Sequence, residues 1–205
     1  VKNMIDPWAS TSVDYDKLVT QFGIQKISDI IDDIKDPQRL MKRGVVFGHR
    51  EFNEINNLIN KKEDFAVVTG MMPSGQMHIG HKMVVDQLIW YQQKGAMLSL
   101  PIADLESYAA RDMSFERGKQ IAVDEYLTNW IALGLDLERD NVNVYLQSQN
   151  KSLFDLEFKA SRKTNFSQLH AIYGFDNSTN IAHVHAPLMQ VADLSLPQIE
   201  EYGGP

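Results

Sequence analysis

Two histidines and the loop that precedes them form the segment best suited to chemistry. His78 and His81 are three residues apart, and residues 70–75 before them are rich in Gly, Met, Pro and Ser. A spacing of three places two side chains on the same helix face. The N–H groups at a helix start attract anions, and imidazole rings there add further donors. The segment therefore predicts a site for a phosphate chain, especially one that gains negative charge in a transition state.

The same segment differs from two common phosphate-binding loops. It has neither the Gly-Lys-Ser/Thr of a Walker loop nor the Gly-x-Gly-x-x-Gly of dinucleotide sites. Gly80, between the two histidines, leaves room for a flat base to lie against the backbone. A chance His-x-Gly-His string is expected in about 1 chain in 100 of this size, so its place between a strand and a helix matters more than the string itself.

The elements around this segment alternate between strand and helix. Apolar runs predict buried strands, and amphipathic stretches between them predict helices. The strands are expected at 65–69, 97–103 and 142–147, and the helices at 77–94 and 115–133. This order predicts a doubly wound parallel sheet of the α/β class, which binds ligands beyond the carboxyl ends of its strands. Residues 70–80 and 104–108 fall there.

The chain divides into two regions by pattern. In residues 1–64, short helical patterns, among them 15–22 and 49–61, are broken by Pro and Gly. We expect a small, mainly helical N-terminal extension there. Residues 65–205 carry the α/β pattern, and the chain is expected to be mostly helical after residue 151.

Composition removes several classes of protein. The 205 residues are 43% hydrophobic, carry a formal net charge of −7 and include no cysteine. An acidic chain does not bind nucleic acid through a large uniform cationic surface. Without cysteine there is no disulfide framework, thiolate zinc site or cysteine nucleophile. With no apolar run long enough for a membrane helix or a signal peptide, we expect a cytoplasmic protein without a membrane partner.

Three further polar side chains lie where a ligand could meet them. Glu106 follows the second predicted strand, where a carboxylate could hold a cation or simply be a solvated residue at a helix start. Gln190 and Asp193 are three apart in the apolar run 187–193, so we expect them to share one face. Buried polar groups need a partner. That partner is either a ligand or another side chain of the core.

Several segments resemble one family. The segment PSGQMHIGH resembles the HIGH signature of class I aminoacyl-tRNA synthetases. DPW, VDYDKLVTQFG and KRGVVFGHREF resemble the N-terminal extension of archaeal and eukaryotic tryptophanyl-tRNA synthetases. YGFDNSTNIAHVHAPLMQVADLSLPQIEEYGGP resembles the archaeal catalytic domain of that family. The resemblance spans essentially the whole chain.

The resemblance implies a Rossmann-like (HUP-type) catalytic domain and a two-step reaction. The carboxylate of L-tryptophan attacks the α-phosphate of ATP, pyrophosphate leaves, and the aminoacyl group passes to tRNA(Trp). His78 and His81 are then the catalytic residues, which stabilise charge on the α-phosphate. Mg²⁺ is expected to bind through the ATP phosphates, without a protein metal site. The expected ATP contacts are Gly70, Met71, Pro73, Ser74, Gly75, His78, Gly80 and His81.

The resemblance also implies an amino-acid pocket. Glu106 and Gln190 would hold the α-ammonium group, and Asp193 would accept the ring N–H. Val68 occupies the position at which tyrosyl relatives carry a Tyr that bonds the substrate hydroxyl. Because a site lacking that partner cannot select for a hydroxyl, Val68 favours tryptophan over tyrosine.

Alternatives remain open at this point. No KMSKS-like loop is present, and the chain ends within what the resemblance implies is the catalytic domain, so we expect an incomplete enzyme with little activity of its own. A tyrosyl-tRNA synthetase, a nucleotidyltransferase that uses an HxGH loop, and a non-catalytic ligand-binding fragment or paralogue are the competing interpretations. A homodimer is expected by resemblance, with residues 164–175 either at its interface or in the core.

Overall fold

The computed structural model describes residues 23–111 and 113–200. The chain divides into two compact units, Val1–Glu63 and Asp64–Pro205. The helix expected at 15–22, the DPW segment and the final EYGGP lie outside the described residues.

The first unit is built of short elements around a small apolar core. The N–H of Ile27 donates to the carbonyl of Phe47 at 3.0 Å, beside an antiparallel pair of two-residue strands. The helix expected at 49–61 begins at Phe52, because His49 belongs to the strand pair. The elements of this unit are β1 (Gln25–Lys26), η1 (Ile27–Asp29), η2 (Ile31–Asp33), α2 (Arg39–Lys42), β2 (Gly48–His49) and α3 (Phe52–Lys61).

The second unit contains the parallel sheet that the sequence predicts. Its strands are β3 (Ala66–Val68), β4 (Met97–Ile102) and β5 (Val142–Leu146), in the order β3-β4-β5. Val68 is paired with Ser99, and Ile102 with Leu146, so the carboxyl ends of the three strands lie at one edge. The three expected strands and their parallel arrangement are confirmed.

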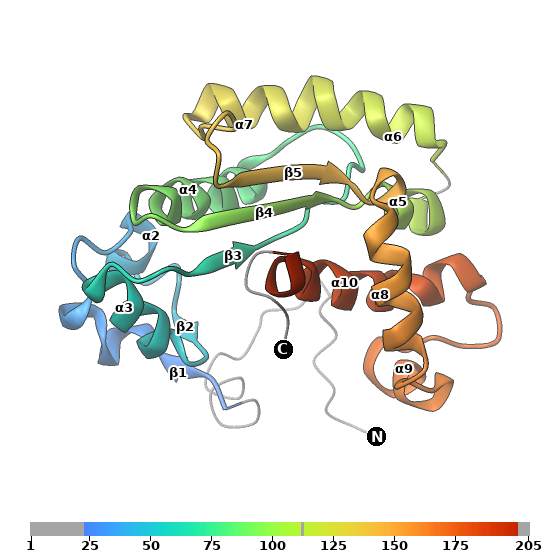
Figure 1. Cartoon of the computed structure of the whole chain (residues 1–205), viewed down its shortest axis with the longest axis horizontal. Helices are drawn as coiled ribbons and strands as arrows, with labels where there is room; N and C mark the ends of the chain where they lie inside the picture. Colours follow the sequence, from blue (N-terminus) through green and yellow to red (C-terminus); the bar gives the residue numbers. More distant parts are fainter. Residues whose placement is uncertain (1–22, 112, 201–205) are drawn as a thin grey trace. The chain divides into compact units, whose positions relative to one another are not determined.

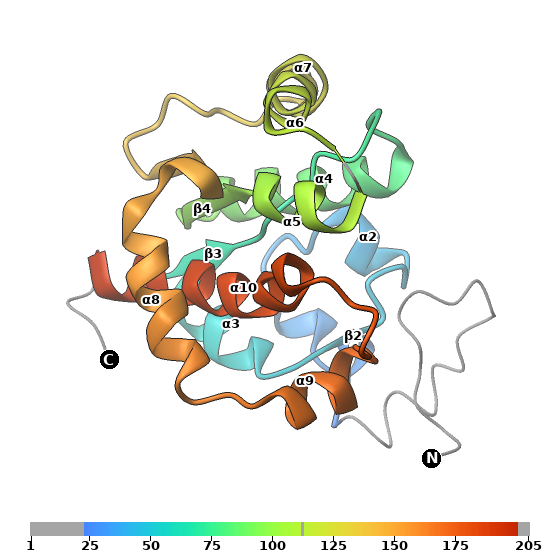
Figure 2. The ribbon, with the colours of Figure 1, turned by 90° about the vertical axis from the view of Figure 1, so that its right-hand side faces the viewer.

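Helices lie on both faces of this sheet, as expected for a doubly wound fold. Figures 1 and 2 show α4 and the stretch from α6 to α7 on one face, and α10 on the other. The helical elements of the unit are α4 (Ile79–Gln93), α5 (Asp104–Arg111), α6 (Phe115–Ile121), the π-helical turn η3 (Ala122–Leu127), α7 (Thr128–Leu133), η4 (Gln147–Gln149), α8 (Lys151–Ser161), α9 (Phe166–Tyr173) and α10 (Ile181–Glu200).

The two helix layers bury large side chains. Trp130 of α7, Leu88 of α4 and Leu100 of β4 are at most 2% exposed. Beneath α8, the residues Leu153, Met189, Ala192 and Leu196 form a second cluster, against which Leu105, Tyr145 and Leu156 pack. Full burial of a side chain of this size stabilises a fold by about 1.5–3 kcal/mol, so these layers hold α10 and α4 firmly against the sheet.

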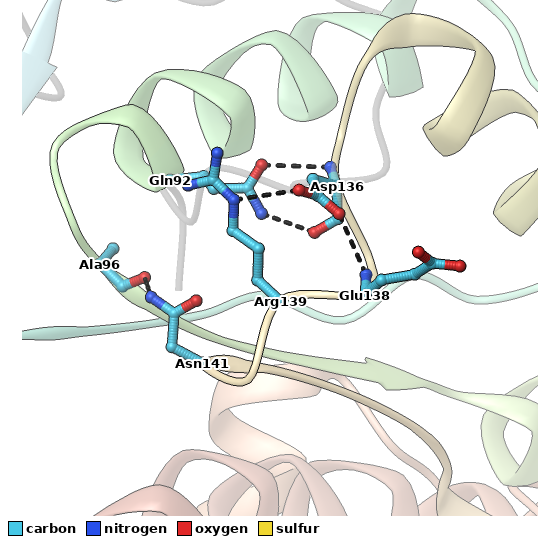
Figure 3. Close-up of polar contacts among 6 residues, drawn as sticks. All are labelled: Gln92, Ala96, Asp136, Glu138, Arg139 and Asn141. Carbon is cyan, nitrogen blue, oxygen red and sulfur yellow. Dashed lines mark hydrogen bonds and ion pairs between the residues drawn. The ribbon is translucent and has the colours of Figure 1, made fainter.

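Polar contacts join neighbouring segments at the edge of the sheet where the strands begin. Figure 3 shows that the Gln92 side chain at the end of α4 exchanges two hydrogen bonds with the backbone of Asp136. The amide Nε2 donates at 2.7 Å, and Oε1 accepts at 3.1 Å. Asn141, just before β5, donates to the carbonyl of Ala96, just before β4, at 2.9 Å. These contacts fix the amino-terminal edge and leave the carboxyl edge available for a site.

At the carboxyl edge, a buried carboxylate joins α5 to η4. Asp104 is fully buried, and its carboxylate accepts bonds from the N–H of Ser148, at 3.0 Å, and from the Ser148 hydroxyl. The sequence analysis allowed a helix start at Glu106 but not this contact, which spans 44 residues. Asp104 therefore sets where α5, and with it Glu106, lies against the sheet.

Replacing Asp104 by alanine is expected to destabilise the chain by about 3 kcal/mol. The change removes two bonds to a charged acceptor and leaves two half-buried donors of Ser148 without this partner. Urea unfolding of the chain measures the effect. Asp124→Ala, at an exposed position of η3, is the control and should change the free energy of unfolding by less than about 0.5 kcal/mol. Equal effects of the two substitutions would contradict this role of Asp104.

Within residues 23–111 and 113–200, none of the helices combines the length and the apolar character that crossing a membrane requires.

Candidate active site

The two histidines form the N-terminus of α4. His78 is the N-cap, with an extended backbone, and its ring Nδ1 accepts the N–H of Gly80 at 3.2 Å. His81 lies one turn further on, and its Nδ1 accepts the N–H of His78, also at 3.2 Å. This is a reciprocal capping box made by two imidazoles. The ring centroids are 3.9 Å apart, so the structure brings together the pair that the sequence singled out.

These bonds determine which ring nitrogens face outward as donors. A nitrogen that accepts a backbone N–H carries no proton, so the proton of the neutral ring lies on Nε2. Burial, and secondarily the neighbouring His78, lowers the pKa of His81 from its usual range. The His81 ring is therefore neutral at pH 7 and offers an Nε2–H beside the free N–H groups at the helix start. Such donors suit a phosphate that gains negative charge.

Gly80 lies directly beside the His78 ring. A Cβ at this position would lie 3.0 Å from Cε1 and 3.1 Å from Nδ1 of His78. A larger residue would therefore crowd the ring and require it to shift. The absence of a side chain at Gly80 favours the capping position of His78.

The loop before α4 is anchored along β4 and beneath η3. The N–H of Met71 donates to the carbonyl of Pro101 at 3.1 Å, and a Cβ on Gly70 would lie 3.2 Å from that same carbonyl. Met71 and Pro73 are buried, whereas Ser74 is exposed. Of the expected ATP contacts in this loop, the side chains of Met71 and Pro73 therefore pack into the protein.

Tyr126 is a residue of this site that the sequence analysis missed. It is 1% exposed, its hydroxyl donates to the carbonyl of Met72 at 3.1 Å, and the edge of its ring meets His81 with centroids 5.3 Å apart. It lies in η3, where the long helix expected at 115–133 contains a π-helical turn. Such turns are often found at functional sites. The sequence pattern gave no signal for this contact, which spans 54 residues.

The acidic residues of the expected amino-acid pocket lie within electrostatic reach of each other. Burial raises the pKa of Glu106, and the charges of His183 and Arg111 oppose that rise. Burial also raises the pKa of Asp193 to about 6, and the negative charge of Glu106 adds to the shift. Two carboxylates that share a poorly solvated region favour a cationic ligand group. His183, on α10, is close enough to Glu106 for its charge to act on that carboxylate.

Gln190 and Asp193 do not share a buried face as expected. Asp193 is 4% exposed, whereas Gln190 is exposed. Side chains three apart on a helix differ by about 60° in direction, so one can face the sheet while the other does not. Val68, at the end of β3, is half-buried and offers no hydrogen-bonding group.

A separate hollow of about 580 Å³ lies at the ends of β4 and β5, lined by Ile102, Tyr145 and Lys151 among others. None of the residues expected to bind ATP or the amino acid lines it. In the described part of the chain, no three His, Asp or Glu side chains come together as a metal site. The histidine pair and the carboxylates of α5 and α10 therefore remain the candidate site.

Comparison with known proteins identifies the class. The family model described as "tRNA synthetases class I (W and Y)" matches residues 60–204. This chain belongs to that family of class I tRNA synthetases. The match includes the sheet, the histidine pair, α5 and all of α10.

Individual relatives confirm the narrower resemblance seen in the sequence. The chain is 50% identical over 198 residues to a tryptophan--tRNA ligase of Methanocaldococcus jannaschii, covering 96% of this chain and 53% of the relative. It is 43% identical to the corresponding ligase of Methanopyrus kandleri, covering 98% of this chain and 54% of the relative. The chain thus spans about half the length of the curated relatives it matches.

Solved structures show the same likeness. A crystal structure of tryptophanyl-tRNA synthetase from Aeropyrum pernix K1 matches with a TM-score of 0.84 at 40% identity, covering 98% of this chain and 55% of that one. A tryptophan-bound synthetase from Encephalitozoon cuniculi matches with a TM-score of 0.76 at 27% identity, covering 87% and 55%. The fold derived above is therefore that of known synthetases.

Proposed function

We propose that the protein to which this chain belongs is a tryptophan--tRNA ligase. It joins L-tryptophan to the α-phosphate of ATP, releases pyrophosphate and transfers tryptophan to tRNA(Trp). The observation that carries the proposal is the adjacent pair His78 and His81 at the start of α4, at the carboxyl edge of a sheet of this family. The similarity to ligases of the same name supports it.

In this proposal the chain contributes the nucleotide site and part of the amino-acid site. The Nε2–H of His81 and the His78 ring stabilise charge on the α-phosphate, and backbone N–H groups of the loop 70–75 contact ATP. Mg²⁺ accompanies ATP through its phosphates. Residues 65–205 form the Rossmann-like catalytic region and residues 1–64 its N-terminal extension. The protein works in the cytoplasm, where translation takes place.

Glu106 and Gln190 would hold the α-ammonium group, and Asp193 would accept the ring N–H. The negative charge of Asp193 near Glu106 supports a cationic group at Glu106. The family includes synthetases for both tryptophan and tyrosine. Because Val68 offers no hydrogen-bonding group to a phenol, the pocket favours tryptophan.

Calorimetric titration of the folded chain with L-tryptophan and with L-tyrosine, each with and without ATP and Mg²⁺, tests the specificity. Saturable heat with tryptophan alone is expected. Binding of tyrosine alone would contradict the assignment and support the tyrosyl alternative.

The exposed face of α9 supports a homodimer. Phe166, Ile172 and Tyr173 are 48%, 66% and 43% exposed, whereas Leu169 of the same helix is buried. Exposed apolar groups at helical spacing are typical of an interface. We therefore place the second copy of the chain against α9.

Replacing both Phe166 and Ile172 by aspartate should convert the complete gene product from dimer to monomer. Two charges in an apolar interface would lack partners on association. Light scattering after size-exclusion chromatography measures the mass, with Gln168→Asp, a polar residue of the same helix, as the control. A dimer that survives the double substitution would exclude this face.

A further inference from the structure

Asp193 is held by two side chains of the neighbouring strand region. The hydroxyl of Tyr145, in β5, donates to Oδ1 of Asp193 at 3.0 Å. The amide Nε2 of Gln147, in η4, donates to Oδ2 at 2.6 Å. Each carboxylate oxygen therefore has one donor and keeps a free lone pair. The contacts span 48 and 46 residues, so no local sequence pattern could predict them.

Gln147 shows why this arrangement is more than packing. The residue is 4% exposed, yet its Oε1 has no hydrogen-bond partner. The carboxylate fixes the amide orientation, because only the NH₂ group can donate to it. The amide of Gln147 is therefore committed to Asp193.

The same turn also holds α5. Ser148, the next residue, donates to Asp104 of α5 through its N–H and hydroxyl. η4 therefore ties α5, which carries Glu106, to α10, which carries Asp193. The two carboxylates of the proposed pocket are positioned by consecutive residues of one short turn.

The electrostatic surroundings of Asp193 are well defined. Glu106 faces it from α5, and Tyr145 and Gln147 from β5 and η4. On α8, Glu157 bonds to His185, which lies about two helical turns before Asp193 on α10. β3 presents only the apolar residues Ala66–Val68. Burial raises the pKa of Asp193, and the bonds from Gln147 and Tyr145 lower it, so these two side chains oppose protonation.

We propose that Tyr145 and Gln147 are positioning residues of the amino-acid site, which hold the Asp193 carboxylate oriented as the acceptor for the ring N–H of the substrate. The inference rests on the proposed function. Neither residue needs to touch the substrate. Their role is to keep the buried Asp193 carboxylate charged at neutral pH and oriented towards the ring N–H.

The test compares Tyr145→Phe and Gln147→Met with the parent in the complete gene product. Carbon-13 NMR of the aspartate carboxyls, with Asp193→Asn used for assignment, follows the ionisation of Asp193 without ligand. Losing one bond to a charged group should raise the pKa of Asp193 by about one unit. The affinity for L-tryptophan should then fall by about threefold at pH 6.5 relative to the parent, and by much less at pH 8.5.

Gln92→Met and Tyr91→Phe are the matched controls. Gln92 is also 4% exposed and bonds through the same amide atoms, but to the backbone of Asp136 at the opposite edge of the sheet (Figure 3). Tyr91 is a half-buried tyrosine of α4. Both controls should leave the carboxyl titration and the pH dependence of binding unchanged.

Two results would overturn the inference. One is an Asp193 titration that is the same in the variants and the parent. The other is an equal loss of affinity at every pH, which a purely structural role predicts. If the parent binds no tryptophan at all, the proposed function fails, and the ligand-free NMR titration still decides whether Tyr145 and Gln147 control the Asp193 carboxylate.

Discussion

Replacing His81 by alanine in the complete gene product should lower the rate of tryptophanyl-adenylate formation by about a hundredfold. The substitution removes one preorganised donor from the α-phosphate, and losses of this kind cost roughly 10²–10³ in rate. It also removes the acceptor for the N–H of His78, so the first turn of α4 loses half of its capping box. Single-turnover measurement of adenylate formation gives the rate directly.

Comparing the effect of the substitution on KM with its effect on kcat distinguishes a transition-state role of His81 from a structural one. We expect kcat and kcat/KM to fall together, with little change in the KM for tryptophan. His81→Asn, which keeps a donor near the same place, should recover part of the rate. His49→Ala, in the first unit, is the control and should stay within about twofold of the parent. A His81→Ala enzyme with the parent's rate would remove the catalytic assignment.

The pH dependence follows from the lowered pKa of His81. Because burial and His78 disfavour its charged form, the ring is already neutral above its usual pKa of 6.5. If the neutral Nε2–H is the working donor, the adenylation rate should not fall as the pH rises through that lowered pKa. A charged imidazolium donor would instead lose activity as the pH rises through the lowered pKa.

Replacing Glu106 by glutamine should weaken the binding of L-tryptophan by about tenfold to a hundredfold. A hydrogen bond to a charged group contributes about 1.5–3 kcal/mol, and glutamine keeps the size of the side chain while removing its charge. The parent should lose affinity as the pH falls through the raised pKa of Glu106, because a protonated carboxyl no longer attracts the ammonium group.

A substrate analogue without the ammonium group isolates this contact. Calorimetry should find that indole-3-propionate binds the parent and Glu106→Gln equally, whereas L-tryptophan distinguishes them. Glu116→Gln, at an exposed position of α6, is the matched control and should bind both ligands as the parent does. Equal weakening for both ligands would mean that Glu106 supports the pocket without contacting the ammonium group.

Local sequence patterns predicted the framework of the second unit well. The apolar runs at 65–69, 97–103 and 142–147 form the strands of the parallel sheet, of which the central strand β4 is buried and β3 and β5 are mostly half-buried. The observed boundaries differ from the expected ones by a few residues. The helix expected from residue 77, for example, begins at Ile79, with His78 as its N-cap. A pattern within about ten residues is enough to predict such a strand, because the burial of that one stretch determines its structure.

The missed features depend on contacts between distant residues. α5 begins at Asp104, whose carboxylate is satisfied by Ser148, and Tyr126 holds the loop carbonyl of Met72. The sequence indicated that Asp193 needs a partner, but Tyr145 and Gln147 could be found only from the folded chain. The prediction that Gln190 and Asp193 lie on a helix was correct. The prediction that both lie on one buried face was wrong, because burial depends on how deeply each side of α10 packs against the sheet.

The most direct test of the central claim is amino-acid-dependent exchange of labelled pyrophosphate into ATP by the complete gene product. The account predicts exchange that depends on L-tryptophan and Mg²⁺, is not supported by L-tyrosine, and falls about a hundredfold in His81→Ala. Exchange that depends on tyrosine, or no exchange with tryptophan from a folded protein that binds ATP, would contradict it.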